Sequence, residues 1–333
     1  MSDRLAAFVT PGSDLNKGIE RVQLAERLGY EAVFATQIAA RDLMMLLSAY
    51  ASATERIKIG SGVLPAFGRH PIATASEAAT LDEMSGGRLI LGLGTAHAVT
   101  MKNWYGFEYA KPLTQFKEYV HIVRSILAEG RCEFSGEFYT VNFGFMGYAA
   151  RPDLPIYTAS LGPKSLEWAG AHADGVVLWG CMPSYIKETA VPTLRKSAQA
   201  AGRDFNKLEI VAAIPCSVAD DVDAARDAFR RDFFVYMTLP FYRRAIAGAG
   251  YQAELDAFDR ALAAGDTDGA RAAMSETMLT EFAAIGTPEA VRSKIDEYRE
   301  AGVTLPAVGA IPVPKEVGPG ADATLQAAIG ADG

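Results

Sequence analysis

Cysteine is scarce in this sequence. The 333 residues include three cysteines, Cys132, Cys181 and Cys216, which are far apart and form no CxxC pair. Disulfide frameworks and thiolate metal sites both need cysteines in close groups, so the sequence indicates neither of them. This cysteine usage fits a reducing compartment, and we expect a cytoplasmic protein.

Long apolar runs and an excess of basic residues are also missing. No segment approaches the ~20 consecutive apolar residues of a membrane span, and the opening MSDRLAAFVTPG lacks the basic and apolar regions of a signal peptide. The formal net charge is -8. Because nucleic acids and anionic membranes attract basic surfaces, we expect neither as a partner. The expected partner is a small-molecule substrate, and we expect the protein to form a homodimer.

The motifs of common catalytic classes are absent as well. The chain has no HExxH, no GxSxG and no Cys-His arrangement, and we expect no metal. The loop GLGTAH at 92–97 begins like a dinucleotide-binding loop, but it lacks the third glycine and no helix is predicted directly after it. These absences favour a bound cofactor that supplies the chemistry while the protein positions it.

A helix followed by a buried strand lies near the middle of the first half of the chain, at 71–97. Apolar residues follow one helical stripe (Ile72, Ala75, Ala78, Leu81, Met84), and acidic residues are expected on the wet side (Glu77, Asp82, Glu83). After two glycines, the segment 89–93 is apolar without interruption. Such a run is typical of a parallel strand that is covered on both faces.

Seven other segments repeat this strand pattern, with helical segments between most of them. Together with 89–93, the expected strands are 5–10, 30–36, 57–64, 156–161, 176–180, 208–218 and 303–311. Strands that alternate with helices form parallel sheets with right-handed crossovers, and eight such units close into a barrel. We therefore predict an α/β fold, a single (β/α)8 TIM barrel over residues 1–333.

Three segments depart from the alternation. Residues 98–155 contain one predicted helix and an aromatic, glycine-rich stretch, and residues 220–284 are mostly helical. We interpret both as insertions, the first of them over the barrel mouth. The tail at 312–333 is rich in glycine, proline and alanine and is expected to be loosely held.

Functional residues of such barrels follow the carboxyl ends of the strands. By this rule the candidates are Thr36, Gln37, 61–64, Thr95, His97, Ser160, Gly162, Pro163 and 179–181. Gly162 and Pro163 stand between a strand and a helix, where backbone N–H groups can bind a phosphate. The spacing alone fits a plain turn equally well.

Four segments carry a family resemblance, in family order over most of the chain. They are ATERIKIGSGVLPAFGRHP (53–71), TLDEMSGGRLILGLGT (80–95), ASLGPKSLEWAGAHADGVVL (159–178) and IGTPEAVRSKIDEYREAGV (285–303). They resemble the luciferase-like flavin and deazaflavin oxidoreductases, in particular the F420-dependent branch that includes methylenetetrahydromethanopterin reductase.

The resemblance implies a barrel that holds the tricyclic ring of coenzyme F420 at its mouth, with FMN as the alternative cofactor. It also implies a non-prolyl cis peptide at Gly62-Val63, behind the ring. The cofactor-binding residues that it implies are Thr36, Ser61, Gly62, Val63, Thr95, Ala159, Ser160, Gly162 and Pro163.

One departure from the family pattern concerns acid–base chemistry. Where deazaflavin relatives often carry Asp-His or Glu-His after the second strand, this chain has Thr36-Gln37. We take His97 and Gln37 as the catalytic candidates, because an imidazole titrates near neutral pH and can move a proton. His97 also fits a stacking or hydrogen-bonding role without acid–base duty.

The sequence thus predicts an F420-dependent oxidoreductase that moves a hydride between the deazaflavin and a small organic substrate. Aromatic residues of the insertions are expected to line the substrate pocket: Trp104, Tyr105, Tyr148, Phe241 and Tyr242. Basic candidates for the acidic tail of the cofactor are Arg69, Lys164, Arg243 and Arg244. The alternatives are an FMN-dependent monooxygenase and a member that binds its cofactor without catalysis.

Overall fold

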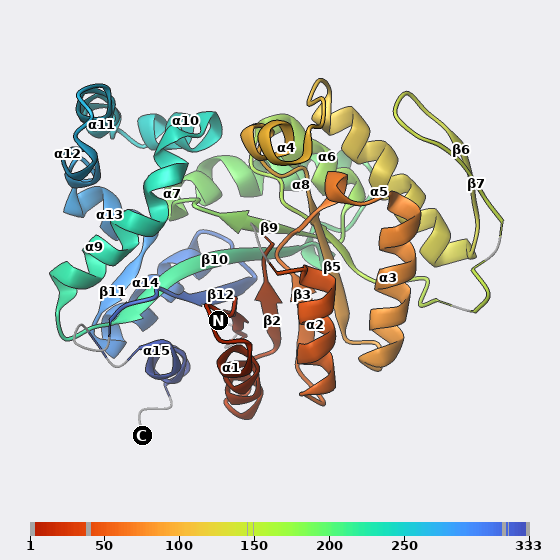
Figure 1. The fold of residues 1–333 in the computed structure, drawn as a ribbon, viewed down its shortest axis with the longest axis horizontal. Coiled ribbons are helices and arrows are strands. Elements are labelled where there is room, and N and C mark those ends of the chain that lie inside the picture. Colours follow the sequence, from red (N-terminus) through yellow and green to blue (C-terminus); the bar gives the residue numbers. More distant parts are fainter. Residues whose placement is uncertain are drawn as a thin grey trace.

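The computed structural model describes residues 4–37, 41–144, 146–148, 150–314, 318 and 320–330. Within these residues, parallel strands close into a barrel (Figure 1). In spatial order they are β1 (Ala6–Phe8), β2 (Ala32–Ala35), β3 (Lys58–Ser61) continued by β4 (Leu64–Pro65), β5 (Leu89–Gly94), β8 (Ile156–Thr158), β9 (Gly175–Trp179), β10 (Glu209–Val218) and β12 (Leu305–Ala310). Strand β12 pairs with β1 and closes the ring. The predicted strands and the TIM-barrel architecture are confirmed.

Helices cover the outside of this barrel. They are α1 (Leu15–Arg27), α2 (Leu43–Ser52), α3 (Pro71–Met84), α5 (Pro112–Glu129), α6 (Pro163–His172), α8 (Val191–Ala200), α14 (Pro288–Glu300) and α15 (Ala321–Ala328). Short turns complete the crossovers: η1 (Ala66–Gly68), α7 (Pro183–Tyr185), the π-helical η2 (Ile186–Ala190) and η3 (Phe205–Lys207). Within the described part of the chain, no helix has the length and apolar character needed to cross a membrane.

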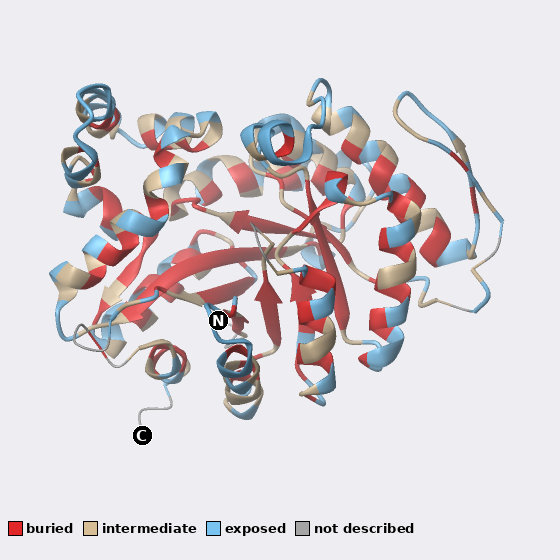
Figure 2. Cartoon of the chain, viewed as in Figure 1, coloured by how far each residue is buried: buried red, intermediate tan, exposed pale blue. Residues whose placement is uncertain are grey.

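Two apolar layers hold the barrel together, and Figure 2 shows the strands as its most buried part. The barrel interior is filled by Ala6, Ala32, Phe34, Ile90, Tyr157, Val177, Val211, Leu305 and Ala307. A larger cluster fills the space between strands and helices. Phe8 and Val63 are half-buried and pack against the interior cluster. Because Phe8 is the last residue of β1 and Val63 follows β3, both lie at the carboxyl ends of the strands and form the floor of the barrel mouth.

Helix α3 differs from its predicted pattern at two residues. Ala78 and Leu81 are buried as expected, but Met84 is 54% exposed. Asp82, which was expected in water, is 4% exposed. The guanidinium of Arg151 binds its carboxylate at 2.8 and 2.9 Å, which compensates the charge that burial would otherwise leave unpaired.

Most of residues 98–155 lies on the outside of the barrel rather than over its mouth. Only α4 (Ala98–Tyr105) follows β5 directly; it was missed because a helix with one buried residue, Met101, has no apolar stripe. The hairpin of β6 (Cys132–Ser135) and β7 (Thr140–Phe143) packs along α5. The Glu118 carboxylate accepts three backbone N–H groups at the tip of this hairpin, at 2.8 to 3.1 Å.

Residues 220–284 form a helical insertion with a core of its own. It comprises α9 (Val222–Phe233), η4 (Phe234–Thr238), α10 (Pro240–Gly248), α11 (Gln252–Ala263), α12 (Thr267–Ala272) and α13 (Glu276–Phe282), and the chain returns through β11 (Ala284–Gly286). Its apolar cluster includes Met182, which follows β9, and packs against Trp179 and Leu161 at the ends of β9 and β8. The insertion therefore stands at the barrel mouth.

The predicted loose tail contains a packed helix. Helix α15 buries Leu325 (1% exposed), and the Tyr30 hydroxyl donates to the carbonyl oxygen of Leu325 at 2.7 Å. Glycine and alanine content suggested a loose segment, but small residues also permit close packing against α14 and β10. Residues 315–317, 319 and 331–333 of the predicted tail lie outside the described residues.

Candidate active site

The floor of the mouth is made by two side chains and by glycines that keep it flat. The peptide Gly62-Val63 is cis, as the resemblance implied, and separates β3 from β4. A Cβ atom at Gly62 would lie 2.5 Å from Cζ of Phe8, and one at Gly94 would lie 2.6 Å from Cγ2 of Val63. Both glycines are therefore required by close packing around the floor.

Ser61 supports this floor from within. Its Oγ donates to the Gly92 carbonyl at 2.8 Å and accepts from the Gly92 N–H at 2.7 Å. The side chain is fully buried, with 0% exposure. Ser61, predicted to bind the cofactor, therefore uses its hydroxyl to join β3 to β5 and has no free hydroxyl to offer a ligand.

The turn between β8 and α6 presents an open backbone at the mouth. Ser160 is buried, and its Oγ lies 3.0 Å from Oγ1 of Thr158. The Gly162 N–H donates to Oγ of Ser165 at 3.1 Å, while the Ser165 hydroxyl donates to the Gly162 carbonyl at 2.8 Å. A Cβ at Gly162 would meet nothing closer than Ser165 Oγ at 3.9 Å. Pro163 then starts α6.

The glycine at 162 is not explained by the protein's own packing. Its φ of -86° and ψ of 158° are accessible to any residue. Among the described residues, the backbone N–H groups of Ser160 and Leu161 have no hydrogen-bond acceptor. An uncrowded turn with free N–H groups beside a helix N-terminus fits an anionic group such as a phosphate.

His97 lies at the mouth between β5 and the helical insertion. Its ring centroid is 6.3 Å from that of Tyr236 and 6.4 Å from that of Tyr242. The side chain keeps an exposed surface, but its neighbours exclude water from part of the ring, and this desolvation lowers the pKa of His97 below its ordinary value. A lowered pKa keeps the imidazole neutral at pH 7.

Thr95 and Ala96 connect β5 to His97 through an unusual backbone. Ala96 has a φ of +56°, which a residue with a Cβ adopts rarely and at a cost. The Tyr109 hydroxyl donates to the Ala96 carbonyl at 3.1 Å and so supports this conformation. Thr95 is half-buried, and its hydroxyl donates to the Ala96 carbonyl at 3.4 Å.

Gln37 is held by its neighbours. Its Oε1 accepts from the Leu43 N–H at 3.2 Å and from the Arg69 guanidinium at 3.4 Å. Arg69 also pairs with Asp42, the residue that caps α2. Gln37 thus connects the segment after β2 to α2, and both hydrogen bonds use its side-chain carbonyl oxygen. The neighbouring Thr36 is half-buried at the end of β2.

The five predicted substrate residues do not form one group. Tyr242 is 4% exposed and lies beside His97, and Phe241 packs against Tyr242 with ring centroids 5.3 Å apart. Trp104 and Tyr105, on α4, are 60% and 44% exposed. Tyr148 does not belong to the mouth. Its hydroxyl lies 3.2 Å from Oγ1 of Thr80, which is about 14 Å along α3 from the first residue of the helix at a rise of 1.5 Å per residue.

Sequence reasoning missed two residues of the mouth, Phe8 and Tyr236. The strand-end rule that selected Thr36 and Thr95 missed Phe8, because the first strand was expected over 5–10, whereas it ends at Phe8 in the structure. Tyr236 lies in η4, and no periodic pattern of 220–284 relates it to the barrel. Trp179, named only as part of 179–181, packs against Tyr236 with ring centroids 5.7 Å apart.

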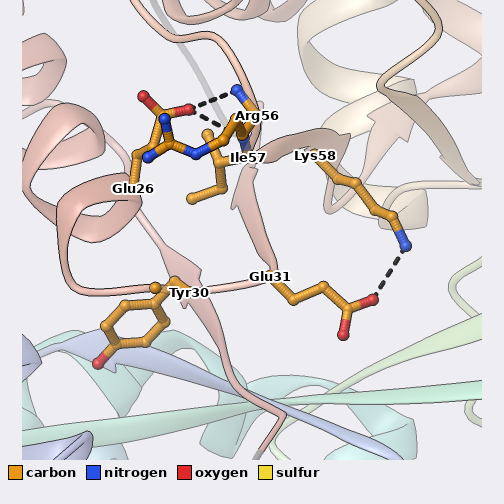
Figure 3. A pocket seen from close by; sticks show the side chains of 7 residues that line it. Glu26, Tyr30, Glu31, Arg56, Ile57 and Lys58 are labelled. Carbon is orange, nitrogen blue, oxygen red and sulfur yellow. Dashed lines mark hydrogen bonds and ion pairs between the residues drawn. The ribbon is translucent and has the colours of Figure 1, made fainter.

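A separate groove of about 310 Å³ opens at the opposite end of the barrel (Figure 3). Its lining is charged, and both of its carboxylates are bound within the protein: Glu26 accepts three backbone N–H groups of residues 55–57, and Glu31 pairs with Lys58. We therefore assign this groove to barrel stability. Elsewhere in the described ranges, no group of three or more His, Cys, Asp or Glu residues is placed to hold a metal ion.

The fold and the mouth together define a (β/α)8-barrel protein whose mouth, at the carboxyl ends of its strands, carries an open backbone turn beside aromatic side chains. The model of the luciferase-like monooxygenase family matches residues 1–305, and the chain belongs to this family.

Two relatives are 5,10-methylenetetrahydromethanopterin reductases. The protein from Archaeoglobus fulgidus is 31% identical over 293 residues, which cover 86% of this chain and 87% of the relative. The protein from Methanolobus tindarius is 32% identical over 297 residues, which cover 88% and 90%. The solved structure of the coenzyme F420-dependent tetrahydromethanopterin reductase of Methanopyrus kandleri matches with a TM-score of 0.86 at 26% identity, covering 98% of this chain and 97% of that one.

Proposed function

We propose that this chain is an F420-dependent oxidoreductase that transfers a hydride between the deazaflavin and a small organic substrate. Family membership and the reductase relatives support the proposal. Within the chain, the observation that carries it is Gly162: the turn is open to a phosphate where the fold itself would accept a side chain.

The residues present fit a tricyclic ring with a phosphorylated side chain. Phe8 and Val63 would lie against one face of the ring, with Gly62 and Gly94 keeping that face flat. The turn from Ser160 to Pro163 would hold the phosphate through its N–H groups and the positive end of α6. When bound, reduced F420 supplies a hydride; the protein positions it and limits the access of water.

Charge near the turn favours a cofactor with an acidic tail. Lys164 and Arg244 are exposed, and neither has an ion-pair partner in the described part of the chain. The other two basic candidates are committed elsewhere: Arg69 to Asp42, and Arg243 to Asp259. We therefore assign the electrostatic attraction of the tail to Lys164 and Arg244.

A titration of the purified protein with F420 and with FMN, followed by absorbance, tests the proposal. We expect F420 to bind with a dissociation constant in the micromolar range or below, and FMN not to bind. Binding of FMN alone would favour a monooxygenase. Tight binding of F420 without hydride transfer to any member of a broad substrate panel would favour a cofactor-binding protein without turnover. A cytoplasmic location and a homodimer remain part of the proposal, and gel filtration tests the dimer.

A further inference from the structure

The open turn after β8 is held by a tyrosine from the neighbouring crossover. The Tyr185 hydroxyl donates to the Leu161 carbonyl oxygen at 2.5 Å. Tyr185 is the last residue of α7, which follows β9, and β8 and β9 are paired in the barrel. The turn at 160–163 therefore depends on a side chain that lies more than twenty positions later in the chain.

This hydrogen bond fixes the direction of one peptide group. In a trans peptide the C=O and N–H bonds point in opposite directions. The Leu161 carbonyl points to Tyr185, and the N–H of the same peptide, which belongs to Gly162, donates to Ser165 Oγ at 3.1 Å. The carbonyl oxygen is thus directed toward α7, and the N–H toward the first turn of α6.

The glycine at 162 leaves this peptide free to rotate unless something holds it. Rotation by half a turn would carry the φ of Gly162 from -86° to positive values, which glycine adopts without a steric penalty. The rotated peptide would place the Leu161 carbonyl at the N-terminus of α6, where the Gly162 N–H is now. A carbonyl oxygen is an acceptor and cannot bind an anion, so rotation would spoil the turn for a phosphate.

The local structure directs Tyr185 toward the turn. Helix α7 continues into α8 through the π-helical η2, and α8 packs against α6. A π-helical turn contains an additional residue, which changes the side chains that share a face before and after it. The Tyr185 ring also packs edge-on against Phe241 of α10, with ring centroids 5.8 Å apart and an interplanar angle of 78°. Phe241 thus holds the ring from the side of the helical insertion.

The Tyr185 hydroxyl remains a donor at neutral pH. Burial raises the pKa of the phenol to about 12, and the positive charge of Arg244 opposes this rise. At pH 7 the phenol is therefore protonated. Arg244 is the exposed cation to which the attraction of an acidic tail was assigned above, so the same part of the mouth carries a positive charge and a fixed backbone.

We infer that Tyr185 is a positioning residue of the phosphate site: its hydroxyl holds the Leu161 carbonyl away from the ligand, so the turn prefers a ligand with a phosphate group to the same ligand without one. The inference deepens the proposed function and rests on its phosphate turn, but not on the identity of the ring. Tyr185 acts through Leu161 and is not itself a ligand.

The test compares two probes that differ only in the phosphate, the deazaflavin nucleoside and its phosphate monoester. Dissociation constants of both are measured with the whole chain at constant ionic strength, from the fluorescence of the ring. We expect the wild type to bind the monoester about 100-fold more tightly, the effect of one or two hydrogen bonds to a charged group. Tyr185→Phe, which keeps a ring beside Phe241, should reduce this preference about tenfold and leave the affinity for the nucleoside unchanged.

Tyr30→Phe is the matched control. It removes the same kind of hydrogen bond, from a phenol to a backbone carbonyl, at the opposite end of the barrel, where Tyr30 donates to Leu325 at 2.7 Å. It should keep the full preference for the monoester. General loss of structure would weaken both probes equally, whereas a rotated peptide weakens only the monoester. A preference that survives Tyr185→Phe, or that falls as far in Tyr30→Phe, would overturn the inference.

Inorganic phosphate separates this inference from the cofactor proposal. Without any cofactor, phosphate is titrated into protein with isotope-labelled leucine, and the N–H signal of Leu161 is followed by NMR. We expect the signal to shift in the wild type at phosphate concentrations about tenfold lower than in Tyr185→Phe. If neither deazaflavin binds but this difference is seen, the cofactor proposal fails and the inference stands. If the nucleoside binds as tightly as its monoester, or if the two proteins respond equally to phosphate, the inference fails whichever ring is bound.

Discussion

Replacement of Gly162 tests whether this glycine is needed for folding or for binding of the cofactor phosphate. The backbone at 162 is extended, and a Cβ would meet no atom within 3.9 Å, so the free protein accommodates a side chain there. Gly162→Val and Gly162→Ala lose a similar helix-capping preference, and each is expected to reduce the free energy of unfolding by no more than about 1 kcal/mol.

The two variants should differ in affinity for F420. A valine side chain would stand in the space where a phosphate approaches the turn and would displace hydrogen bonds to a charged group, each of which contributes about 1.5 to 3 kcal/mol. Loss of about 3 kcal/mol corresponds to a dissociation constant raised ~100- to 200-fold. Alanine, with one methyl group, should cause a smaller loss.

The assay is a titration with F420 at constant ionic strength, with thermal unfolding of the same samples. His97→Ala is the comparison, since His97 also lies at the mouth, after the neighbouring strand β5, but is not part of the turn. Its effect on affinity should be far smaller than that of Gly162→Val. If both Gly162 variants bind F420 as the wild type does, or if His97→Ala weakens binding as strongly, the phosphate does not bind at this turn.

Two further predictions concern stability. Arg4, and then Lys58, hold the pKa of Glu31 at about 2, below its ordinary value of 4.5. The stabilisation is therefore present above pH 4.5 and is lost as the pH falls toward 2. Glu31→Gln should lower the free energy of unfolding by about 2 kcal/mol at pH 7 and by much less near pH 2. Urea unfolding of the wild type and the variant at both pH values checks this. A difference between the two proteins that does not change with pH contradicts it. Leu325→Ala should cost about 3 kcal/mol in urea unfolding, because α15 buries this side chain. An unchanged midpoint would mean that the tail is loosely held after all.

The barrel was predictable because its signals are local. Uninterrupted apolar runs such as 89–93 identify buried parallel strands without knowledge of their neighbours, and the caps of α14, with Thr287 before Pro288, mark where a helix begins. Since a parallel barrel brings the carboxyl ends of all its strands together, this reading also placed Thr95, His97 and Gly162 on one rim. The cis peptide at Gly62-Val63 came from family resemblance.

Chain direction and spacing alone determined the eight strands, their order along the chain and the end of the barrel at which a ligand is expected. Only the tertiary structure decided which side chains meet there, because such contacts join residues that are distant in the sequence. In the structure Tyr148 lies beside α3 and away from the mouth, and the side chains of Ser61 and Gln37 are held in hydrogen bonds within the protein. Tyr236 of the insertion packs against Trp179 and His97. Packing fixes these positions, and a pattern along one segment carries no information about the segment it packs against.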